Sequence, residues 1–426
     1  MNRTARSTRS LVLCGLAGLA VANCSSSNDP ATPDLSTADA PKTSDSRPQG
    51  DALSTETALS DSAGNDAAKE PEIVPLGLYV VKRDGTGLRL FANTGTKALT
   101  HVRAERGSDW LTATRYHLDA DNNGFAMEGE GPNNKSYDGT EIVLFRSSDP
   151  SQLYHIAGNT PGKLCANSSF TGDGKVIHLQ ETGDGTVFKR VTFGTMPTIV
   201  STETIPMPSQ LITPVDPHQV GASDGTGKIV FSATFQHTAG WMRPVWRMPA
   251  TGTSELSQVE VIGCPICPAQ NGCCSWSDIN QVLGTNDPRM DSTGTKIFWM
   301  HRHPDVSFDF GGTPVYVFRQ ALRVDGQEQR DFNGSNIDVH TTHSYGQWRP
   351  DDKELVYWSI DVDLQVGRVG QELYRMDSDG QNRVRLDLPP SLCVSQPSYL
   401  NQDEIIFTGW RCGGSNCSCA MDQIGQ

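Results

Sequence analysis

The sequence predicts an all-β protein organised as a six-bladed β-propeller. The chain contains 41 glycines and 25 prolines while only 20% of its residues are charged, so turns are frequent. After about residue 70 no helical periodicity of apolar residues is sustained. Instead, short runs rich in Val, Ile, Phe, Tyr and Trp alternate with Gly, Asp, Asn and Pro, which is the pattern of strands joined by turns.

One sequence element recurs along the chain, an Asp- or Gly-containing turn followed at once by an apolar strand. Asp-Gly suits hairpin turns because both residues tolerate positive φ. The copies of this turn–strand element read YDGTEIVLF (137–145), TGDGKVIHL (171–179), SDGTGKIVF (223–231), DSTGTKIFW (291–299), PDDKELVYW (350–358) and NQDEIIFTGW (401–410).

A second phrase follows some of these copies, and it predicts a further strand of each sheet. It reads VWRMPATG (245–252), VYVFRQALRVDG (315–326), LYRMDSDG (373–380) and SCAMDQIG (418–425). Small sheets repeated in this way bury both of their faces only when they stack around an axis, as propeller blades do. Six turn–strand elements predict six blades, and a seventh would require a degenerate copy within residues 92–130.

The first apolar segment, LYVVKRDGTGLRLF (78–91), carries the second phrase without a turn–strand element before it. Propellers must close their ring, and an N-terminal segment can do so by supplying outer strands to the sheet that the C-terminal residues begin. We therefore expect residues 78–91 to pair with the last apolar strand.

The unit QWRPDDKELVYW (347–358) followed by ELYRMDSDGQNRVRL (372–386) resembles the PD40 repeat, which is WD40-like, of TolB-like β-propellers. The resemblance covers residues 75–426 and implies a propeller fold. It leaves the activity open, because proteins with such propellers include partner-binding proteins, enzyme gates and lyases.

Residues 1–23 predict a lipoprotein signal peptide. Three arginines precede LVLCGLAGLAVA, an apolar stretch too short to span a bilayer as a helix. It ends at VANC (21–24), which resembles the bacterial lipoprotein box and implies acylation of Cys24, so that buried methylenes would anchor the chain. An ordinary secretory signal cut nearby is the alternative.

Residues 24–72 consist mainly of Ser, Thr, Asp, Ala and Pro and predict a disordered linker between the lipid anchor and a propeller at 73–426. The serines after Cys24 lack the aspartate that retains some lipoproteins at the inner membrane, which favours the outer membrane of the cell envelope, facing the periplasm or the surface. Loss of three arginines with the signal peptide changes the formal charge from −14 to −17, so nucleic acid is not an expected partner. We expect a monomer.

Nine cysteines remain beyond the signal peptide and Cys24, and an exported chain meets an oxidising compartment. Four of them lie in CPICPAQNGCC, within an insert near 262–276, where disulfides or a zinc knuckle are the alternatives. The disulfide candidates are Cys264, Cys267, Cys273, Cys274, Cys393, Cys412, Cys417 and Cys419. Cys165 is the expected unpaired thiol.

The stretch DADNNGFAMEGE (119–130) matches the pattern of a calcium-binding loop. Its oxygen ligands would come from Asp119, Asp121, Asn123, the carbonyl of Phe125, and Glu130. The following residues cannot form the exiting helix of an EF-hand, so a polar hairpin turn without calcium is the alternative.

The function predicted from the sequence is non-catalytic binding of a protein or glycan in a funnel formed by the blade loops. The residues expected around this funnel precede the apolar strands and are His218, Arg289, His343, Gln347, Trp348 and Gln396. The alternative is a metal-dependent polysaccharide lyase or hydrolase, because imidazoles can hold a transition metal. Its candidate ligands are His301, His303, His340 and His343.

Overall fold

A computed structural model shows an all-β ring. It describes residues 75–117, 126, 139–160, 163–171, 174–182, 186–211, 220–222, 227–233, 235–237, 240–242, 244–263, 285–310, 313–324, 330–331, 341–363, 368–413, 417 and 419, some of them as backbone only. The predicted signal peptide, Cys24 and the predicted linker lie outside these residues. The described part of the chain holds no helix with the length and hydrophobicity that a membrane span requires.

The described strands form six four-stranded antiparallel sheets, which we call blades 1 to 6, each with its strands given from first to fourth. Blade 1 contains β3 (Leu99–Ala104), β4 (Trp110–Tyr116), β5 (Thr140–Arg146) and β6 (Asp149–Gly158). Blade 2 contains β7 (Leu164–Phe170), β8 (Val176–Thr182), β9 (Thr186–Phe193) and β10 (Ile199–Thr204). Blade 3 contains β11 (Val220–Ala222), β12 (Lys228–Ser232), β15 (Val245–Pro249) and β16 (Glu260–Gly263).

The remaining blades complete the set. Blade 4 contains β17 (Thr285–Met290), β18 (Lys296–Phe310), β19 (Thr313–Val324) and β20 (Arg330–Asp331). Blade 5 contains β21 (Thr341–Trp348), β22 (Glu354–Asp363), β23 (Arg368–Asp377) and β24 (Val384–Arg385). Blade 6 contains β25 (Leu392–Tyr399), β26 (Glu404–Arg411), β1 (Gly77–Lys82) and β2 (Arg89–Asn93). A separate hairpin pairs β13 (Phe235–His237) with β14 (Gly240–Met242), and short 3-10 helices span Ser209–Leu211 and Leu256–Gln258.

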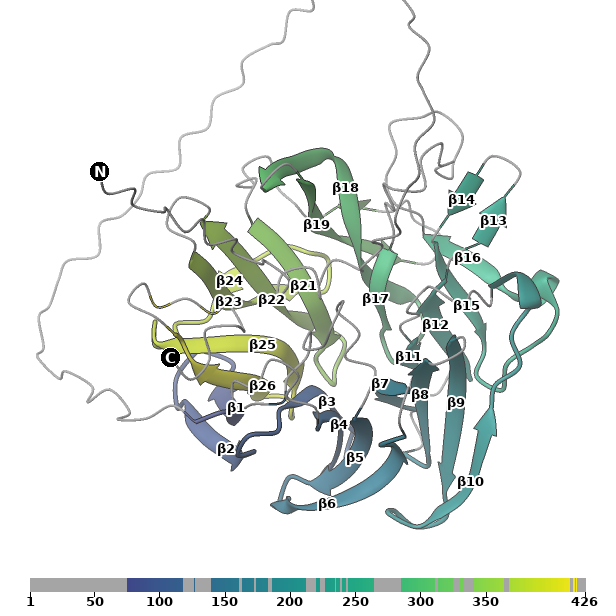
Figure 1. Cartoon of the computed structure of the whole chain (residues 1–426), viewed down its shortest axis with the longest axis horizontal. Helices are drawn as coiled ribbons and strands as arrows, with labels where there is room; N and C mark the ends of the chain where they lie inside the picture. Colours follow the sequence, from purple (N-terminus) through teal and green to yellow (C-terminus); the bar gives the residue numbers. More distant parts are fainter. Residues whose placement is uncertain are drawn as a thin grey trace, which may run out of the picture. The chain divides into compact units, whose positions relative to one another are not determined.

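The first strands of the six blades form a closed ring. Each contacts the first strand of the next blade, in the order β3, β7, β11, β17, β21, β25 and back to β3. Figure 1 shows the blades arranged around this ring. The β-propeller prediction is therefore confirmed by the sheets themselves.

The ring closes in blade 6 by the predicted pairing of distant segments. Strand β1 runs antiparallel to β26, with Leu78 opposite Thr408 and Val80 opposite Ile406. Figure 1 shows β1 and β2, drawn in purple, beside β25 and β26, drawn in yellow. Segment 78–91 thus supplies the third and fourth strands to a sheet that the C-terminal part of the chain begins.

One turn–strand element does not occupy the position that the repeat suggests. Five copies form the second strand of their blades, but YDGTEIVLF (137–145) forms β5, the third strand of blade 1. The second strand is β4, which lies within residues 92–130. The degenerate copy in that segment therefore completes blade 1 and does not add a seventh blade.

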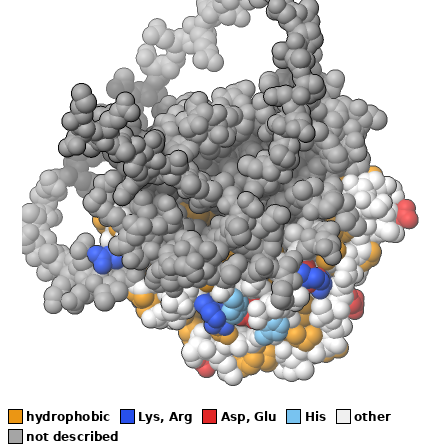
Figure 2. Space-filling view, in the orientation of Figure 1, with side chains coloured by type: hydrophobic (Ala, Val, Ile, Leu, Met, Phe, Trp, Pro, Cys, Tyr) orange, Lys and Arg blue, Asp and Glu red, His pale blue; other side chains and the backbone are white. Residues whose placement is uncertain are grey.

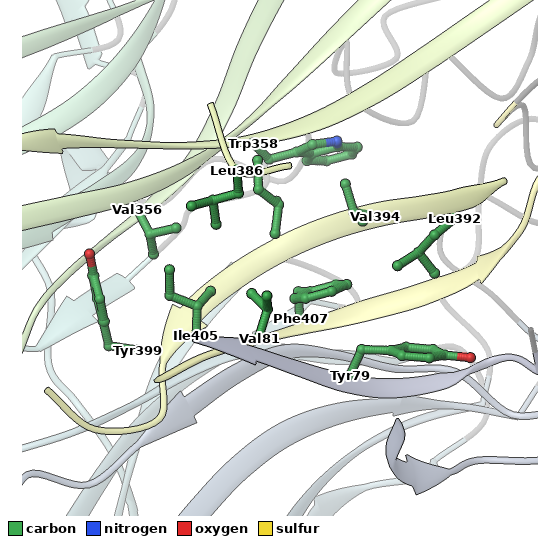
Figure 3. Packing of buried hydrophobic residues seen from close by; sticks show 11 residues of the cluster. Tyr79, Val81, Val356, Trp358, Leu386, Leu392, Val394, Tyr399, Ile405 and Phe407 are labelled. Atoms are coloured by element: carbon green, nitrogen blue, oxygen red, sulfur yellow. The ribbon is translucent and has the colours of Figure 1, made fainter. Parts of the chain in front are cut away.

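The hydrophobic core lies between neighbouring blades. Between blades 5 and 6, Tyr79, Phe407 and Val394 pack with Val356 and Trp358, as Figure 3 shows. The Tyr79 and Phe407 rings stack with centroids 6.0 Å apart. Central strands such as β26 are buried along nearly their whole length because each blade is covered on both faces.

A buried carboxylate adds a polar connection between blades 5 and 6. Glu354, whose side chain is 1% exposed, begins β22 and accepts hydrogen bonds from Arg83 Nε at 2.8 Å, from Arg375 Nη1 at 2.9 Å and from the Tyr399 hydroxyl. Burial acts to raise the pKa of Glu354, but the hydrogen bonds from Arg83 and Tyr399 outweigh it and lower the pKa.

Two predicted disulfide regions are described near the ring closure. Cys393 pairs with Cys419 at a Cα–Cα distance of 5.4 Å, and Cys412 pairs with Cys417 at 4.9 Å, both within the range of protein disulfides. Cys165 is the free, buried cysteine among the described residues, and burial raises the pKa of its thiol to about 12. The candidates Cys264, Cys267, Cys273 and Cys274 lie outside the described residues.

Candidate functional site

Five of the six first strands share a β-bulge, and in three of them a described bulge residue adopts the left-handed conformation. The pairing register shifts between Thr100 and Arg103 in β3, and at the corresponding places in β7, β17, β21 and β25. The described bulge residues with positive φ are His101 (51°), Asn167 (54°) and Gln396 (49°). A side chain in this conformation costs about 1 kcal/mol or more, so the surrounding structure must hold it in place.

The bulges of blades 6 and 1 are joined directly. The backbone N–H of His101 donates to Gln396 Oε1 at 2.7 Å, and the His101 ring lies 3.0 Å from the Thr100 hydroxyl. Burial, followed by the positive charges of Arg103 and Arg289, lowers the pKa of His101 well below its usual range. This imidazole is therefore neutral at physiological pH.

The six first strands contribute one residue each to a shared level that we call the central layer, which in five of them lies two residues beyond the bulge position. The pairing registers place Arg103 opposite Thr112, Arg289 opposite Phe298 and Gln347 opposite Val356. These partners occupy equivalent positions of the second strands. The same registers complete the central layer, whose members are Arg103, Ser169, Gly221, Arg289, Gln347 and Ser398.

At one face of the ring, turns that join first and second strands are linked by charged groups. Arg106, after β3, donates from Nη2 to Asp352 Oδ1 at 2.6 Å, although blade 6 lies between blades 1 and 5. The hydroxyl of Ser292, from the turn after β17, donates to the same carboxylate. The turns of blades 1, 4 and 5 therefore meet at Asp352, close to the ring axis.

The predicted funnel residues are placed in different ways. Arg289 and Gln347 belong to the central layer, and Gln396 occupies a bulge position. Trp348 is 2% exposed and its indole N–H donates to the Arg289 carbonyl at 3.2 Å, so it packs between blades and has no surface to offer a partner. His343 lies in β21, of which only the backbone is described at that point, and His218 lies outside the described residues.

The candidate metal-binding histidines are described only in part. His301 lies in β18 and pairs with Arg319, while His343 pairs with Ser359 of β22. These registers put His301 and His343 at the same height in neighbouring blades. The structure describes only the backbone of His301, His303 and His343. His340 lies outside the described residues. Among the side chains that are described, no group of three or more His, Cys, Asp or Glu could hold a metal ion.

The ligand residues of the predicted calcium loop, Asp119, Asp121, Asn123, Phe125 and Glu130, lie outside the described residues. Ala126, in the middle of the loop, is described and is 3% exposed. Its N–H donates to Thr96 O at 2.7 Å, and its carbonyl accepts from Ala98 N at 2.9 Å. The loop is thus attached at its midpoint to the segment that precedes β3.

A second polar cluster lies where this loop leaves and rejoins blade 1. Glu141 contacts His117 Nε2 at 2.6 Å and His155 Nδ1 at 2.8 Å. Burial acts to raise the pKa of Glu141, but the hydrogen bonds from His155 and His117 outweigh it, so the pKa is lowered. Figure 2 shows histidine side chains beside Lys or Arg side chains on the visible described surface.

The sequence analysis did not identify Arg103, which belongs to the central layer, or His101, which occupies a bulge position. A basic residue in a short strand reads as solvent-exposed, yet Arg103 is 3% exposed. Aligning RAERG (103–107) with RMDSTG (289–294) would have revealed that both arginines stand two residues before the turn.

Comparisons with known proteins find distant similarity to solved β-propeller structures. No known protein-family model matches the sequence, and the comparison with curated proteins finds no match. Among solved structures, the β-propeller domain of the trilobed protease from Pyrococcus furiosus is 11% identical, with a TM-score of 0.41 over 75% of this chain and 79% of that one. An oligogalacturonate lyase in complex with manganese is 11% identical, with a TM-score of 0.39 over 81% of this chain and 98% of that one. Scores this low carry no argument about function.

Proposed function

We propose that the chain is an exported, TolB-like propeller lipoprotein that binds a protein or glycan of the cell envelope without changing it chemically. A lipid on Cys24 would anchor it, and residues 24–72 would hold the propeller away from the membrane. A rigid closed ring that gathers polar side chains from several blades suits binding, because preorganised groups lose little entropy when a ligand arrives.

The observation that carries this proposal is the polar ring centre. The bulge residues and the central layer contribute His101, Arg103, Arg289, Gln347 and Gln396 from four different blades. Hydrophobic clusters make up most of the described packing between neighbouring blades, with further buried polar groups such as Glu354 among them. Buried polar groups at the meeting point of several sheets are costly to maintain, so a binding role explains them better than stability does.

The proposal is tested by capture on the immobilised full chain from a soluble envelope extract, with mass spectrometry of what is retained and released. We expect one species to be retained and to leave with its mass unchanged. Variants Gln347→Ala and Gln396→Ala should retain at least tenfold less of it, while Gln381→Ala, in an exposed turn, should behave as wild type. Equal retention by all variants would remove the ring centre from the binding site, and a changed mass would indicate an enzyme.

The anchor is tested separately by growing cells with labelled palmitate. We expect label on the wild-type chain and none on a Cys24→Ala variant, which should leave the membrane fraction. Label that persists in the variant, or a wild type without label, would remove lipidation from the proposal and favour the ordinary secretory signal.

The metal-dependent lyase or hydrolase remains the second candidate, because the registers put His301 and His343 at the same height in neighbouring blades. Metal analysis of the purified chain separates the two functions. Stoichiometric transition metal in the wild type that is lost in a His301→Ala, His343→Ala variant would favour the enzyme. Absence of bound metal after supplementation would leave the binding function.

A further inference from the structure

The polar cluster around Glu141 in blade 1 is larger than the two histidines described above. Arg115 Nη1 donates to Glu141 Oε1 at 3.3 Å, and Lys97 Nζ donates to His117 Nδ1 at 3.1 Å. Because a lysine ammonium only donates, Nδ1 of His117 is the acceptor and its Nε2 donates to Glu141. The side chain of Glu141 is 8% exposed, whereas that of His155 is 54% exposed. A nearly buried carboxylate thus holds basic groups that reach the surface.

Blade 2 repeats this arrangement around Glu181 in β8. The carboxylate accepts hydrogen bonds from Lys189 Nζ at 2.6 Å and from Lys163 Nζ at 3.2 Å. Burial acts to raise the pKa of Glu181, but the hydrogen bonds from the two lysines outweigh it and lower the pKa. The side chain of Glu181 is 14% exposed and that of Lys163 is 45% exposed. In both clusters the carboxylate lies beneath basic partners that are more exposed than it is.

The two clusters lie side by side where blades 1 and 2 meet. Glu141 pairs with Gly158 of β6, and Cys165 of β7 pairs with Glu181. A Cβ added at Gly158 would lie 2.9 Å from Glu141 Cα and 2.9 Å from Cys165 Cβ, so the paired strands approach closely. We call the combined surface the basic patch. Its members are Lys97, Arg115, His117, His155, Lys163 and Lys189, above Glu141 and Glu181.

The basic patch is positive on a protein that is acidic as a whole. Its four Lys and Arg side chains stand against two carboxylates, so the formal charge of these side chains is two positive with both imidazoles neutral. The whole chain carries a formal charge of −14. Charges farther apart than about 8 Å are largely screened at physiological ionic strength. A short anionic segment that contacts the patch alone is therefore attracted, whereas an extended anionic surface such as a membrane also meets the acidic remainder.

We propose that the basic patch binds an acidic segment of a partner protein, a stretch of chain that carries several Asp or Glu side chains. The inference rests on the proposed binding function and names the chemistry of the partner. Carboxylates form charge-assisted hydrogen bonds with Lys and Arg, and acidic motifs are recognised by clusters of such residues. Glu141 and Glu181 hold the basic groups in place beforehand, which reduces the entropy lost on binding.

The residue types around the patch favour a peptide over a sugar or a lipid. None of the exposed large hydrophobic side chains that the structure describes lies on β4, β5, β6, β8 or β9, the strands that carry the patch. A sugar ring would find no exposed aromatic platform on these strands, and a lipid surface would find no apolar anchor. Recognition at the patch therefore depends on charge.

Fluorescence anisotropy of matched peptides with the full chain tests the proposal. The probes are a short peptide of alternating Glu and Ser and the same peptide with Gln in place of Glu, both carrying a neutral dye. We expect the Glu peptide to bind at least tenfold more tightly than the Gln peptide, and its affinity to fall as the salt concentration rises. Equal affinities would overturn the proposal. So would stronger binding of a glucuronate oligomer, inorganic phosphate or phosphatidylglycerol vesicles than of the Glu peptide.

Variants locate the binding. Lys163→Gln combined with Lys189→Gln should weaken binding of the Glu peptide at least tenfold. Arg385→Gln, which removes an exposed arginine that pairs with Glu372 in blade 5, should leave it unchanged. Circular dichroism shows whether each variant folds, and if the double variant does not, the single variants Lys163→Gln and Arg115→Gln decide. Unchanged affinity in the folded variants would refute the basic patch.

Capture from the envelope extract separates this inference from the proposed function. If the patch receives the partner, the lysine double variant should retain at least tenfold less of the captured species than wild type does. A species that this variant retains fully, and that Gln347→Ala and Gln396→Ala lose, would refute the patch and keep the proposed function. Binding of the Glu peptide with no species retained from the extract would keep the patch and remove the proposed function.

Discussion

Buried histidines make the fold sensitive to mild acid. His178 in β8 is fully buried, and its Nε2 lies 2.9 Å from the Ala250 carbonyl of blade 3. Burial, partly offset by this hydrogen bond, lowers the pKa of His178 to about 4. The folded protein therefore resists protonation at a site that protonates readily in the unfolded chain.

We predict that the contribution of neutral His178 to the free energy of unfolding is complete above pH 6.5. This contribution is lost as the pH falls from 6.5 towards 4. The unfolded chain binds the proton first, so the loss from His178 reaches roughly 3 kcal/mol near the pKa of the folded state. Urea unfolding across this range measures it. His178→Gln should flatten the slope, and His155→Gln, at a half-exposed side chain, should keep it. A slope that His178→Gln leaves untouched would contradict this assignment.

The carboxylate of Glu354 should matter far more than an exposed ion pair of the same kind. Glu354→Gln leaves Arg83 and Arg375 without their anion, and we expect a loss of about 2 to 3 kcal/mol in the free energy of unfolding. Glu404→Gln removes the partly exposed partner of Arg89, whose own side chain is exposed, and should cost less than about 1 kcal/mol. Equal urea midpoints for the two variants would show that the buried network does not stabilise the ring.

The sequence led to some residues of the first strands where a side chain lies beside a visible repeat. Arg289, Gln347 and Gln396 were expected around a binding funnel because they lie just before the predicted inner strands, and the structure places all three in first strands. Arg103 and His101 were not expected, since the left-handed bulge that brings them to the axis leaves no mark in composition or hydropathy.

Strand β1 should contribute more to stability than its neighbour β2. Leu78 is fully buried between blades 6 and 1, whereas Leu90 in β2 is 43% exposed. We expect Leu78→Ala to lower the free energy of unfolding by about 3 kcal/mol and Leu90→Ala by less than about 1 kcal/mol. Chemical denaturation of both variants checks the difference. Similar losses would mean that β1 does not close the ring as described.

The two disulfides at the ring closure should contribute unequally. Cys393–Cys419 spans 26 residues and Cys412–Cys417 spans five, so the longer loop removes more entropy from the unfolded chain. We expect a loss of about 3 kcal/mol for Cys393→Ser with Cys419→Ser, and about 2 kcal/mol for the shorter pair. Thermal unfolding compares the double variants. A larger effect from the shorter loop would argue against the entropic account.

At the scale of elements, the repeat predicted the strands but misplaced one of them. Strand β4 reads WLTATRY, and its threonines look polar although Thr112 and Thr114 are fully buried. Thr112 satisfies its hydroxyl through contacts to Val143 O at 3.2 Å and Ser168 Oγ at 2.9 Å. Hydropathy therefore passed over β4 and assigned its role to the more apolar β5.

At the scale of the whole molecule, ring closure was predictable because two similar phrases stand near the beginning and near the end of the predicted propeller, residues 73–426. The central layer was not, because it is assembled from strands that are far apart in the chain and meet only when all six blades are in place. The chemistry of the site therefore depends on the closed ring, because each blade supplies only one residue of the central layer and no single blade carries a recognisable motif for it.

The most direct measurement of the central claim is NMR of the full chain with ¹⁵N-labelled arginine side chains. Resonances of Arg103 and Arg289 are assigned by their absence from the Arg103→Gln and Arg289→Gln variants. On titration with the species that the immobilised chain retains from the envelope extract, both resonances should shift together and saturably, while that of Arg89 should not move. Shifts confined to exposed arginines, or none at all while the species is still retained, would place the ligand away from the ring centre and contradict the account.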